Sequence, residues 1–166
     1  MPAEFRPRGL FEHLAQHDVD YVVVGGIAAT LHGSERNTFD LDICPDQTPA
    51  NLDKLGAALI EIDARLRDID EDVPFVPDGR SLAGIEILTL STLLGPVDVI
   101  VRPHGSPPYS ALRRRATRLE VGAPVPVLIA SIDDLIAMKR ESGRPKDRDD
   151  IERLEALTRL SRRLAR

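Results

Sequence analysis

The chain carries, at residues 21–44, the segment YVVVGGIAATLHGSERNTFDLDIC, in which two strand patterns flank a glycine pair and a short helix pattern. The β-branched run 21–24 predicts a buried strand that ends at the glycines. Residues 27–32 predict a helix that stops at the next glycine. The run 39–44 alternates apolar and acidic residues, so we expect a second strand with one apolar face.

The second predicted strand sets two acids side by side. Phe39, Leu41 and Ile43 are expected to point into the core. Asp40 and Asp42 then share the other face, with Cα atoms ~7 Å apart. Two neighbouring carboxylates repel each other unless a cation lies between them, and hard cations such as Mg²⁺ prefer oxygen ligands. A strand with a solvated polar face would show the same spacing without any metal.

The rest of the chain mixes helix and strand patterns, which is typical of an α/β (α+β) domain. Its length suits a single domain over residues 1–166, with a core at 8–130 and a C-terminal helical segment at 131–166. The charged, proline-containing stretch 65–80 predicts a loop. Further helices are expected at 9–17, 49–62, 109–115, 132–140 and from Asp147 or Asp149 onward, and further strands at 85–91, 97–101, 119–121 and 125–129.

Two of these helices carry more specific predictions. Ser131 and Asp134 resemble a capping box at the start of the helix 132–140, with Asp in place of the usual Glu. The apolar spacing also predicts which side chains face the core. They are Leu52, Leu55, Leu59 and Ile62 in the helix 49–62, and Ile151, Leu154, Leu157 and Leu160 in the last helix.

The composition excludes several classes of protein. A net charge of -5 and a pI near 5.4 argue against a protein that coats nucleic acid. The single cysteine, Cys44, excludes an intramolecular disulfide and a zinc site built on several thiolates. No apolar run approaches the roughly 20 residues of a membrane helix, and the polar N-terminus shows no leader pattern. We therefore expect a cytoplasmic protein without a membrane partner.

Three features near the acid pair strengthen the prediction of a metal and phosphate site. Gly25-Gly26 opens a predicted helix, where free backbone N–H groups favour phosphate, although ordinary strand–helix turns also use glycine pairs. Asp98 interrupts a β-branched run and would supply a third carboxylate for a two-metal site, unless it simply faces outward. Arg36 and Thr38 lead directly into the acids and can reach phosphate oxygens.

Together these residues resemble the signature of the DNA polymerase β-like nucleotidyltransferase superfamily: an apolar strand, a glycine pair, a short helix and Asp-x-Asp. The Arg-x-Thr-x-Asp-x-Asp form at 36–42 is most similar to the AbiEii/MenT-like branch, whose members include toxins of toxin–antitoxin pairs. The resemblance covers residues 22–43 well and includes Asp98 as the third acid. It implies a nucleotidyltransferase fold, in which helices flank a mixed, twisted β-sheet.

The resemblance also implies a reaction, the transfer of an NMP from an NTP such as ATP to an acceptor hydroxyl with release of pyrophosphate. Asp40 and Asp42 would hold two Mg²⁺ ions, with Mn²⁺ as an alternative, that bridge the triphosphate. Asp98 would bind the second metal and take the proton of the acceptor hydroxyl. Gly25 and Gly26 would approach the phosphates, and Gly26 departs from the serine that many relatives have at that position.

The scarce lysines add a further expectation, because the chain has only Lys54, Lys139 and Lys146. By the same resemblance, Lys139 would meet the triphosphate and Asp147 would support the nucleotide site, with Asp150 an equal match. A solvated lysine at a helix end and an aspartate at a helix N-cap are the purely structural interpretations.

The acceptor stays open between the 3′ end of a tRNA, a protein hydroxyl and a small molecule such as an aminoglycoside or lincosamide. A toxin would also have a cognate antitoxin as partner. Two arginine clusters would contact an RNA acceptor through its phosphates or else form solvated faces. They are Arg113, Arg114, Arg115 and Arg118, and Arg159, Arg162, Arg163 and Arg166.

A different class of function remains as the alternative, a degenerate nucleotidyltransferase-fold domain that binds a nucleotide or a partner without chemistry. A dinucleotide-binding module would explain the glycine pair, but the third spaced glycine of that motif is missing. A P-loop is excluded because no Gly-Lys-Ser/Thr occurs. His32 and Cys44 are expected to be structural residues.

Overall fold

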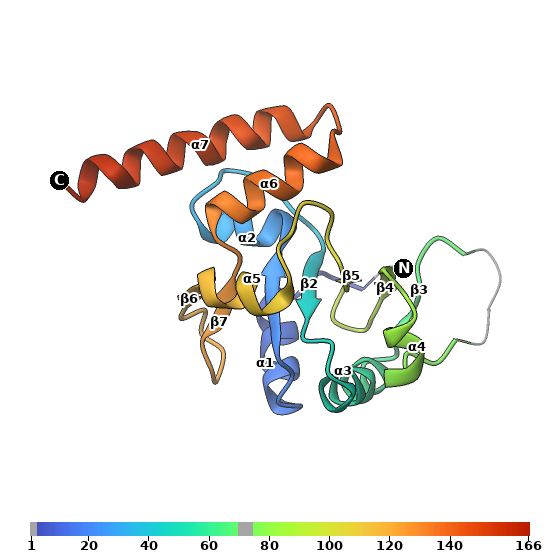
Figure 1. Ribbon diagram of the computed structural model, residues 1–166. Coiled ribbons are helices and arrows are strands. Elements are labelled where there is room, and N and C mark those ends of the chain that lie inside the picture. The colour runs from blue at the N-terminus through green and yellow to red at the C-terminus, as the bar shows by residue number, and fades with distance from the viewer. Residues whose placement is uncertain (1–2, 70–74) are drawn as a thin grey trace.

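The computed structural model describes residues 3–69 and 75–166, and this part of the chain forms one seven-stranded sheet with flanking helices (Figure 1). The order of the strands across the sheet is β3-β4-β5-β2-β1-β7-β6. The strands are β1 (Tyr21–Val24), β2 (Leu41–Pro45), β3 (Arg65–Leu66), β4 (Ile87–Ser91), β5 (Val97–Ile100), β6 (Thr117–Leu119) and β7 (Val127–Ile129). The helices are α1 (Pro7–Gln16), α2 (Gly25–Leu31), α3 (Pro49–Glu61), α4 (Gly79–Ala83), α5 (Tyr109–Arg115), α6 (Ile132–Ser142) and α7 (Asp147–Leu164).

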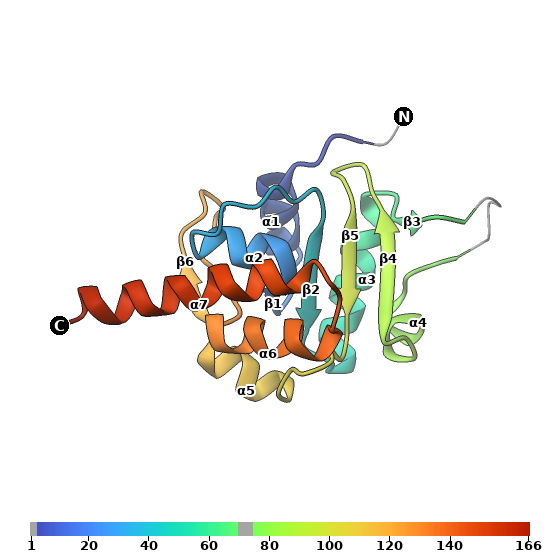
Figure 2. The ribbon, with the colours of Figure 1, turned by 90° about the horizontal axis from the view of Figure 1, so that it is seen from above.

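The sheet is mixed, which confirms the predicted α/β class. Strand β2 lies in the middle, antiparallel to β1 and parallel to β5. Strand β1 is in turn parallel to β7, and the pairs β3–β4, β4–β5 and β6–β7 are antiparallel. Helices α1 and α3 cover one face of the sheet, while α2 and α6 cover the other with α7 packed against α6 (Figures 1 and 2).

The core lies on both faces of the central strands, one of which is covered by helix α3. The predicted inner face of that helix is confirmed, because Leu52, Leu55, Leu59 and Ile62 are all buried. Burial of each such side chain stabilises the fold by roughly 1.5–3 kcal/mol. The consecutive buried valines of β1 show that the central strands are covered on both faces, as in parallel sheets.

The alternation predicted for 39–44 is correct only from Leu41 onward. The chain bends at Asp40, and β2 begins at the next residue. Phe39 therefore precedes the strand and is 72% exposed, so its predicted place in the core is wrong. Cys44 follows Asp42 by two residues on β2 and is buried, with its sulfur 3.9 Å from the carbonyl oxygen of Val101.

The C-terminal helices differ from the prediction in their ends. The hydroxyl of Ser131 accepts a hydrogen bond from the N–H of Asp134 at 3.1 Å, as a capping residue should. Helix α6 then runs to Ser142, two residues beyond the predicted end at 140. Lys146 occupies the N-cap of α7, so the predicted aspartate cap is wrong. The carboxylate of Asp147 instead accepts hydrogen bonds from residues of the preceding turn.

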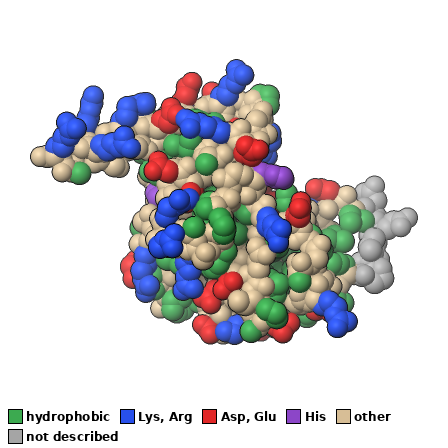
Figure 3. Space-filling model, in the orientation of Figure 1, with side chains coloured by type: hydrophobic (Ala, Val, Ile, Leu, Met, Phe, Trp, Pro, Cys, Tyr) green, Lys and Arg blue, Asp and Glu red, His purple; other side chains and the backbone are tan. Residues whose placement is uncertain are grey.

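The apolar stripe of α7 is confirmed at its beginning and wrong at its end. Leu154 is fully buried against the body of the protein. Leu160 is 53% exposed, because the second half of α7 extends past α6 into solvent (Figure 1). The basic residues of this half project from the molecule in the space-filling view (Figure 3).

Several element boundaries shift by a few residues. Strand β4 starts at Ile87 rather than 85, and β6 and β7 occupy 117–119 and 127–129 rather than 119–121 and 125–129. The stretch 65–80, predicted as a loop, contains the short strand β3 and the start of α4, and its residues 70–74 lie outside the described part. None of the helices in the described ranges has both the length and the apolar character of a membrane span.

Candidate active site

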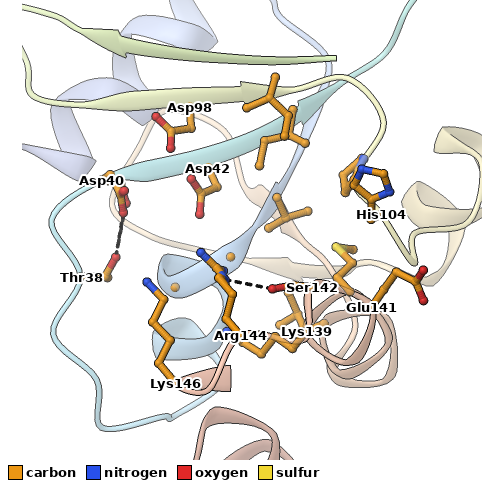
Figure 4. Close-up of a pocket in the computed structure, with 18 of the residues that line it drawn as sticks. Thr38, Asp40, Asp42, Asp98, His104, Lys139, Glu141, Ser142, Arg144 and Lys146 are labelled. Carbon is orange, nitrogen blue, oxygen red and sulfur yellow. Dashed lines mark hydrogen bonds between the residues drawn. The ribbon is translucent and has the colours of Figure 1, made fainter. Parts of the chain in front are cut away.

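Three carboxylates meet at one end of the central strands. Parallel pairing of β2 with β5 sets Asp42 directly beside Asp98. Asp40 lies at the bend that leads into β2. One carboxylate oxygen from each of the three residues lies within 4.8 Å of the others, an arrangement that could hold a metal ion. Figure 4 shows these three side chains, which we call the acidic wall, along one side of a cavity of about 600 Å³.

Without a bound cation, the carboxylates of the acidic wall are disfavoured in their charged form. Burial, together with the neighbouring charges of Asp40 and Asp98, raises the pKa of Asp42 to about 7. Burial also raises the pKa of Asp98, although the guanidinium of Arg67 opposes this shift. Carboxylates whose charged forms are disfavoured by burial and by each other gain most from a bound cation. The oxygen donors of the wall match the preference of Mg²⁺ and Mn²⁺.

The glycine pair permits the close approach of the chain to the acidic wall. Gly25 has φ +68°, and a Cβ there would lie 1.9 Å from Oδ2 of Asp42. A Cβ on Gly26 would lie 2.8 Å from the hydroxyl oxygen of Thr38. The hydroxyl of Thr38 thus fills the space that a serine side chain at residue 26 would need, which is a physical reason for glycine at that position. Both glycines line the cavity.

A second side of the cavity is basic. Arg36, Lys139, Arg144 and Lys146 all line it, and we call them the basic wall. Arg36 comes from the loop before β2, whereas the other three come from α6 and the turn that leads to α7 (Figure 4). Arg144 is close enough to Asp42 to oppose the rise in the pKa of that carboxyl. The basic wall therefore faces the acidic wall across the cavity.

Asp150 anchors two members of the basic wall. The ammonium of Lys139 donates a hydrogen bond to Asp150 at 2.9 Å, and the guanidinium of Arg36 pairs with the same carboxylate oxygen. Lys139 and Asp150 are both buried. Asp147 lies 3.7 Å from the ammonium, so of the two aspartates left open by the sequence, Asp150 makes the closer contact. Neither aspartate lines the cavity itself.

Asp147 holds the turn that carries Arg144. The hydroxyl of Ser142 and the Nε–H of Arg144 both donate to its Oδ2, the latter at 3.1 Å. Burial acts to raise the pKa of Asp147, but these two hydrogen bonds, together with the charges of Arg144 and Lys139, outweigh it and lower the pKa below its usual value. Its carboxylate is therefore charged under ordinary conditions and fixes the turn between α6 and α7.

The sequence reasoning missed several residues at the cavity. Arg67 donates a hydrogen bond to Oδ1 of Asp98 at 2.6 Å, from the turn after the short edge strand β3. Arg144 and Lys146 are not among the expected site residues, although the density of basic residues at 139–148 is a usable signal. His104 and Glu141 line the end of the cavity away from Asp40 (Figure 4). No local pattern marked them.

Other candidates from the sequence lie away from the cavity. Both arginine clusters are outside its lining, and one of them, Arg159, Arg162, Arg163 and Arg166, lies on or just after the second half of α7. His32 pairs through Nε2 with the carbonyl of Ala130 at 2.8 Å. Cys44 is buried, and burial raises the pKa of its thiol to about 12. The hydrogen bond of His32 and the burial of Cys44 agree with the structural roles expected for these residues.

Comparison with known proteins gives a fold-level likeness. No family model and no curated protein sequence matches the chain. Among solved structures, the chain is similar to a candidate nucleotidyltransferase from Thermotoga maritima, with 16% identity, a TM-score of 0.46 and coverage of 97% of each chain.

Proposed function

We propose that the chain is a metal-dependent nucleotidyltransferase that moves an NMP from an NTP to an acceptor hydroxyl and releases pyrophosphate. The observation that carries the proposal is the acidic wall, where Asp40, Asp42 and Asp98 bring one oxygen each within 4.8 Å beside an open cavity. The three carboxylates are partly buried and converge on the cavity, an arrangement that suits a bound cation. The raised pKa of Asp42 supports a site that is completed by a cation.

The acidic wall fits a pair of hard divalent cations, Mg²⁺ or Mn²⁺. All the donor atoms are carboxylate oxygens, and the three side chains come from adjacent strands or the bend before one of them. Asp40 and Asp42 would hold both ions, with Asp98 as the further ligand of the second. When bound, the metals would supply charge neutralisation of the triphosphate and of the oxygens that attack and leave.

The chain's own side chains would orient the nucleotide. Lys139, Arg144 and Lys146 would contact the phosphates, because they face the acids across the cavity. Arg36 and Thr38 would hold the loop at its entrance. In the transfer, the acceptor oxygen bonds to the α-phosphorus while the bond from that phosphorus to the bridging oxygen of pyrophosphate breaks. The proton of the acceptor hydroxyl passes to Asp98.

The branch of the superfamily and the acceptor are proposed from the resemblance at residues 36–42. The Arg-x-Thr-x-Asp-x-Asp spacing supports the AbiEii/MenT-like branch, and with it a toxin that acts on the 3′ end of a tRNA in the cytoplasm and has a cognate antitoxin. Exposed arginines on α7 would suit an RNA acceptor. A protein hydroxyl or an antibiotic-type small molecule remains the other acceptor class.

Incubation with each labelled NTP and a total cell extract tests the activity and identifies the acceptor. We expect label in a single fraction, RNA, protein or small molecule, that depends on Mg²⁺ or Mn²⁺. Calorimetry with each NTP, with and without metal, separates an enzyme from a binding module. Metal-dependent NTP binding without any labelled product would favour the binding module, and the absence of both would overturn the proposal.

A further inference from the structure

Two histidines and a glutamate meet on the opposite face of the sheet from the acidic wall. His13 lies in the last turn of α1, His17 caps the same helix, and Glu61 is the last residue of α3. One ligand atom from each of the three lies within 4.8 Å of the others. Helices α1 and α3 lie side by side beneath the sheet (Figure 1), away from α2 and α6, which line the acidic cavity.

The hydrogen bond of His13 settles which of its nitrogens is free to bind a metal. Nε2 of His13 lies 2.8 Å from the carbonyl oxygen of Ala58. A carbonyl only accepts, so Nε2 carries the proton and donates it, and Nδ1 keeps its lone pair. A metal-binding histidine commonly donates its second ring N–H to a backbone carbonyl in this way, which fixes the ring and its tautomer. His13 is buried, so its ring orientation is held by packing as well.

The other two ligands complete a set that spans two helices. Nε2 of His17 pairs with Oε2 of Glu61 across the gap between α1 and α3. The rings of His13 and His17 lie one turn apart, with centroids 4.8 Å from each other and planes tilted by 58°. Two histidines at i and i+4 on one helix face are a recurrent zinc-binding arrangement. Zinc would take the place of the hydrogen bond with Glu61 at Nε2 of His17, with the proton of the neutral ring on Nδ1.

The backbone around the cluster also favours a cation. Both α1 and α3 end here, and the C-terminus of a helix carries partial negative charge. Two imidazole nitrogens and one carboxylate oxygen are donors for a transition metal rather than for Mg²⁺. Glu61 is 63% exposed, which leaves the site open to solvent for metal entry and for a water as fourth ligand.

We propose that His13, His17 and Glu61 form a zinc-binding site that ties the end of α1 to the end of α3, separate from the site at Asp40, Asp42 and Asp98. An ion pair between Lys54, in the first half of α3, and Asp18, just after α1, joins the same two helices at 3.0 Å. The metal would therefore reinforce a junction that the fold already makes.

A zinc titration of the full chain tests the site. Excess Mg²⁺ is present throughout so that the oxygen ligands of the acidic wall are engaged by the harder cation. NMR of the imidazole rings is the readout. One equivalent of Zn²⁺ is expected to shift the ring signals of His13 and His17 and to leave those of His32 unchanged. The absence of a shift at His13 and His17 would overturn the proposal.

Matched variants show whether the three residues act together. His17→Gln is expected to abolish stoichiometric zinc binding, and Glu61→Gln to weaken it about tenfold or more. Glu12→Gln, on the same helix but outside the cluster, is the control and should bind as the unmodified chain does. Glu61 is exposed, so its variant is expected to fold, which circular dichroism checks. Undiminished binding in both cluster variants, or binding that only Asp42→Asn removes, would contradict the proposed site.

Discussion

The acidic wall and the basic wall of the cavity are built in different ways. The acids come from adjacent strands and the bend before one of them, and strand register brings Asp98 beside Asp42. The basic residues come mostly from α6 and the turn after it, where Asp150 and Asp147 hold Lys139 and Arg144. The basic wall thus has its own counter-charges, whereas the acidic wall depends largely on Arg67 and on whatever cation it binds. This difference explains why burial and repulsion raise the pKa of Asp42.

The largest expected effect comes from loss of an acid from the acidic wall. Asp40→Ala and Asp42→Ala should each lower the rate of nucleotide transfer by about 10³-fold, equivalent to about 4 kcal/mol, because a metal ligand is lost. The initial rate of label transfer measures the effect, and circular dichroism verifies the fold. Asp149→Ala, an exposed acid of α7, is the control and should keep full activity. Full activity of both cavity variants would disprove the assignment.

Removal of the anchor of the basic wall should cost stability instead. Asp150→Ala leaves buried Lys139 and partly buried Arg36 without their shared carboxylate, and we expect a loss of about 3 kcal/mol in the free energy of unfolding. Urea denaturation measures the loss, with Asp149→Ala expected to change it by less than about 0.5 kcal/mol. An equal effect of the two substitutions would show that Asp150 is not an anchor.

Because the charged carboxylates of the acidic wall are disfavoured, the stability of the metal-free protein should depend on pH. The pKa of Asp42 is about 7 in the folded chain, against an ordinary value of 3.8, so the folded state binds more protons between these limits. Stability from this group is present at low pH and lost as the pH rises towards 7. Asp42→Asn should therefore stabilise the metal-free chain by roughly 2–3 kcal/mol above pH 7, with no gain below about pH 4.

Urea denaturation in a chelator across that pH range checks this prediction. Asp149→Asn is the matched control and should follow the pH profile of the unmodified chain. A destabilised Asp42→Asn at high pH would mean that the carboxylate is satisfied without a cation, which would remove the contrast between the two walls.

Alanine in place of Gly25 or of Gly143 gives the smallest expected effect on stability. The comparison of the two variants separates the cost of the backbone conformation from the need for close approach to Asp42. Gly25 has φ +68° and Gly143 has φ +63°, so alanine at either position costs roughly 1–2 kcal/mol. A Cβ on Gly143 would meet nothing within 4 Å, whereas one on Gly25 would collide with Asp42. Gly25→Ala should therefore lose nucleotide transfer and Gly143→Ala should keep it. Similar activities would show that the close approach is dispensable.

Much of the fold was predictable because its signals are local. The valine run of β1, the start of α3 at residue 49 and the Ser131 cap all appear where the sequence predicts them. Errors arose where tertiary structure overrides a local pattern. Phe39 follows the alternation of β2 but precedes a bend, and Leu160 follows the stripe of α7 but lies beyond the end of its partner helix.

The sequence by itself determined the spacing of Asp40 and Asp42, the glycine pair and the run of basic residues beyond Lys139. Such features depend on neighbours a few residues apart, which the periodicity of strands and helices relates directly. Only the tertiary structure decided that Arg67 reaches Asp98, that Asp150 holds both Arg36 and Lys139, and that His17 meets Glu61. These contacts join distant segments, and their geometry follows from strand register and helix packing, which no local pattern encodes.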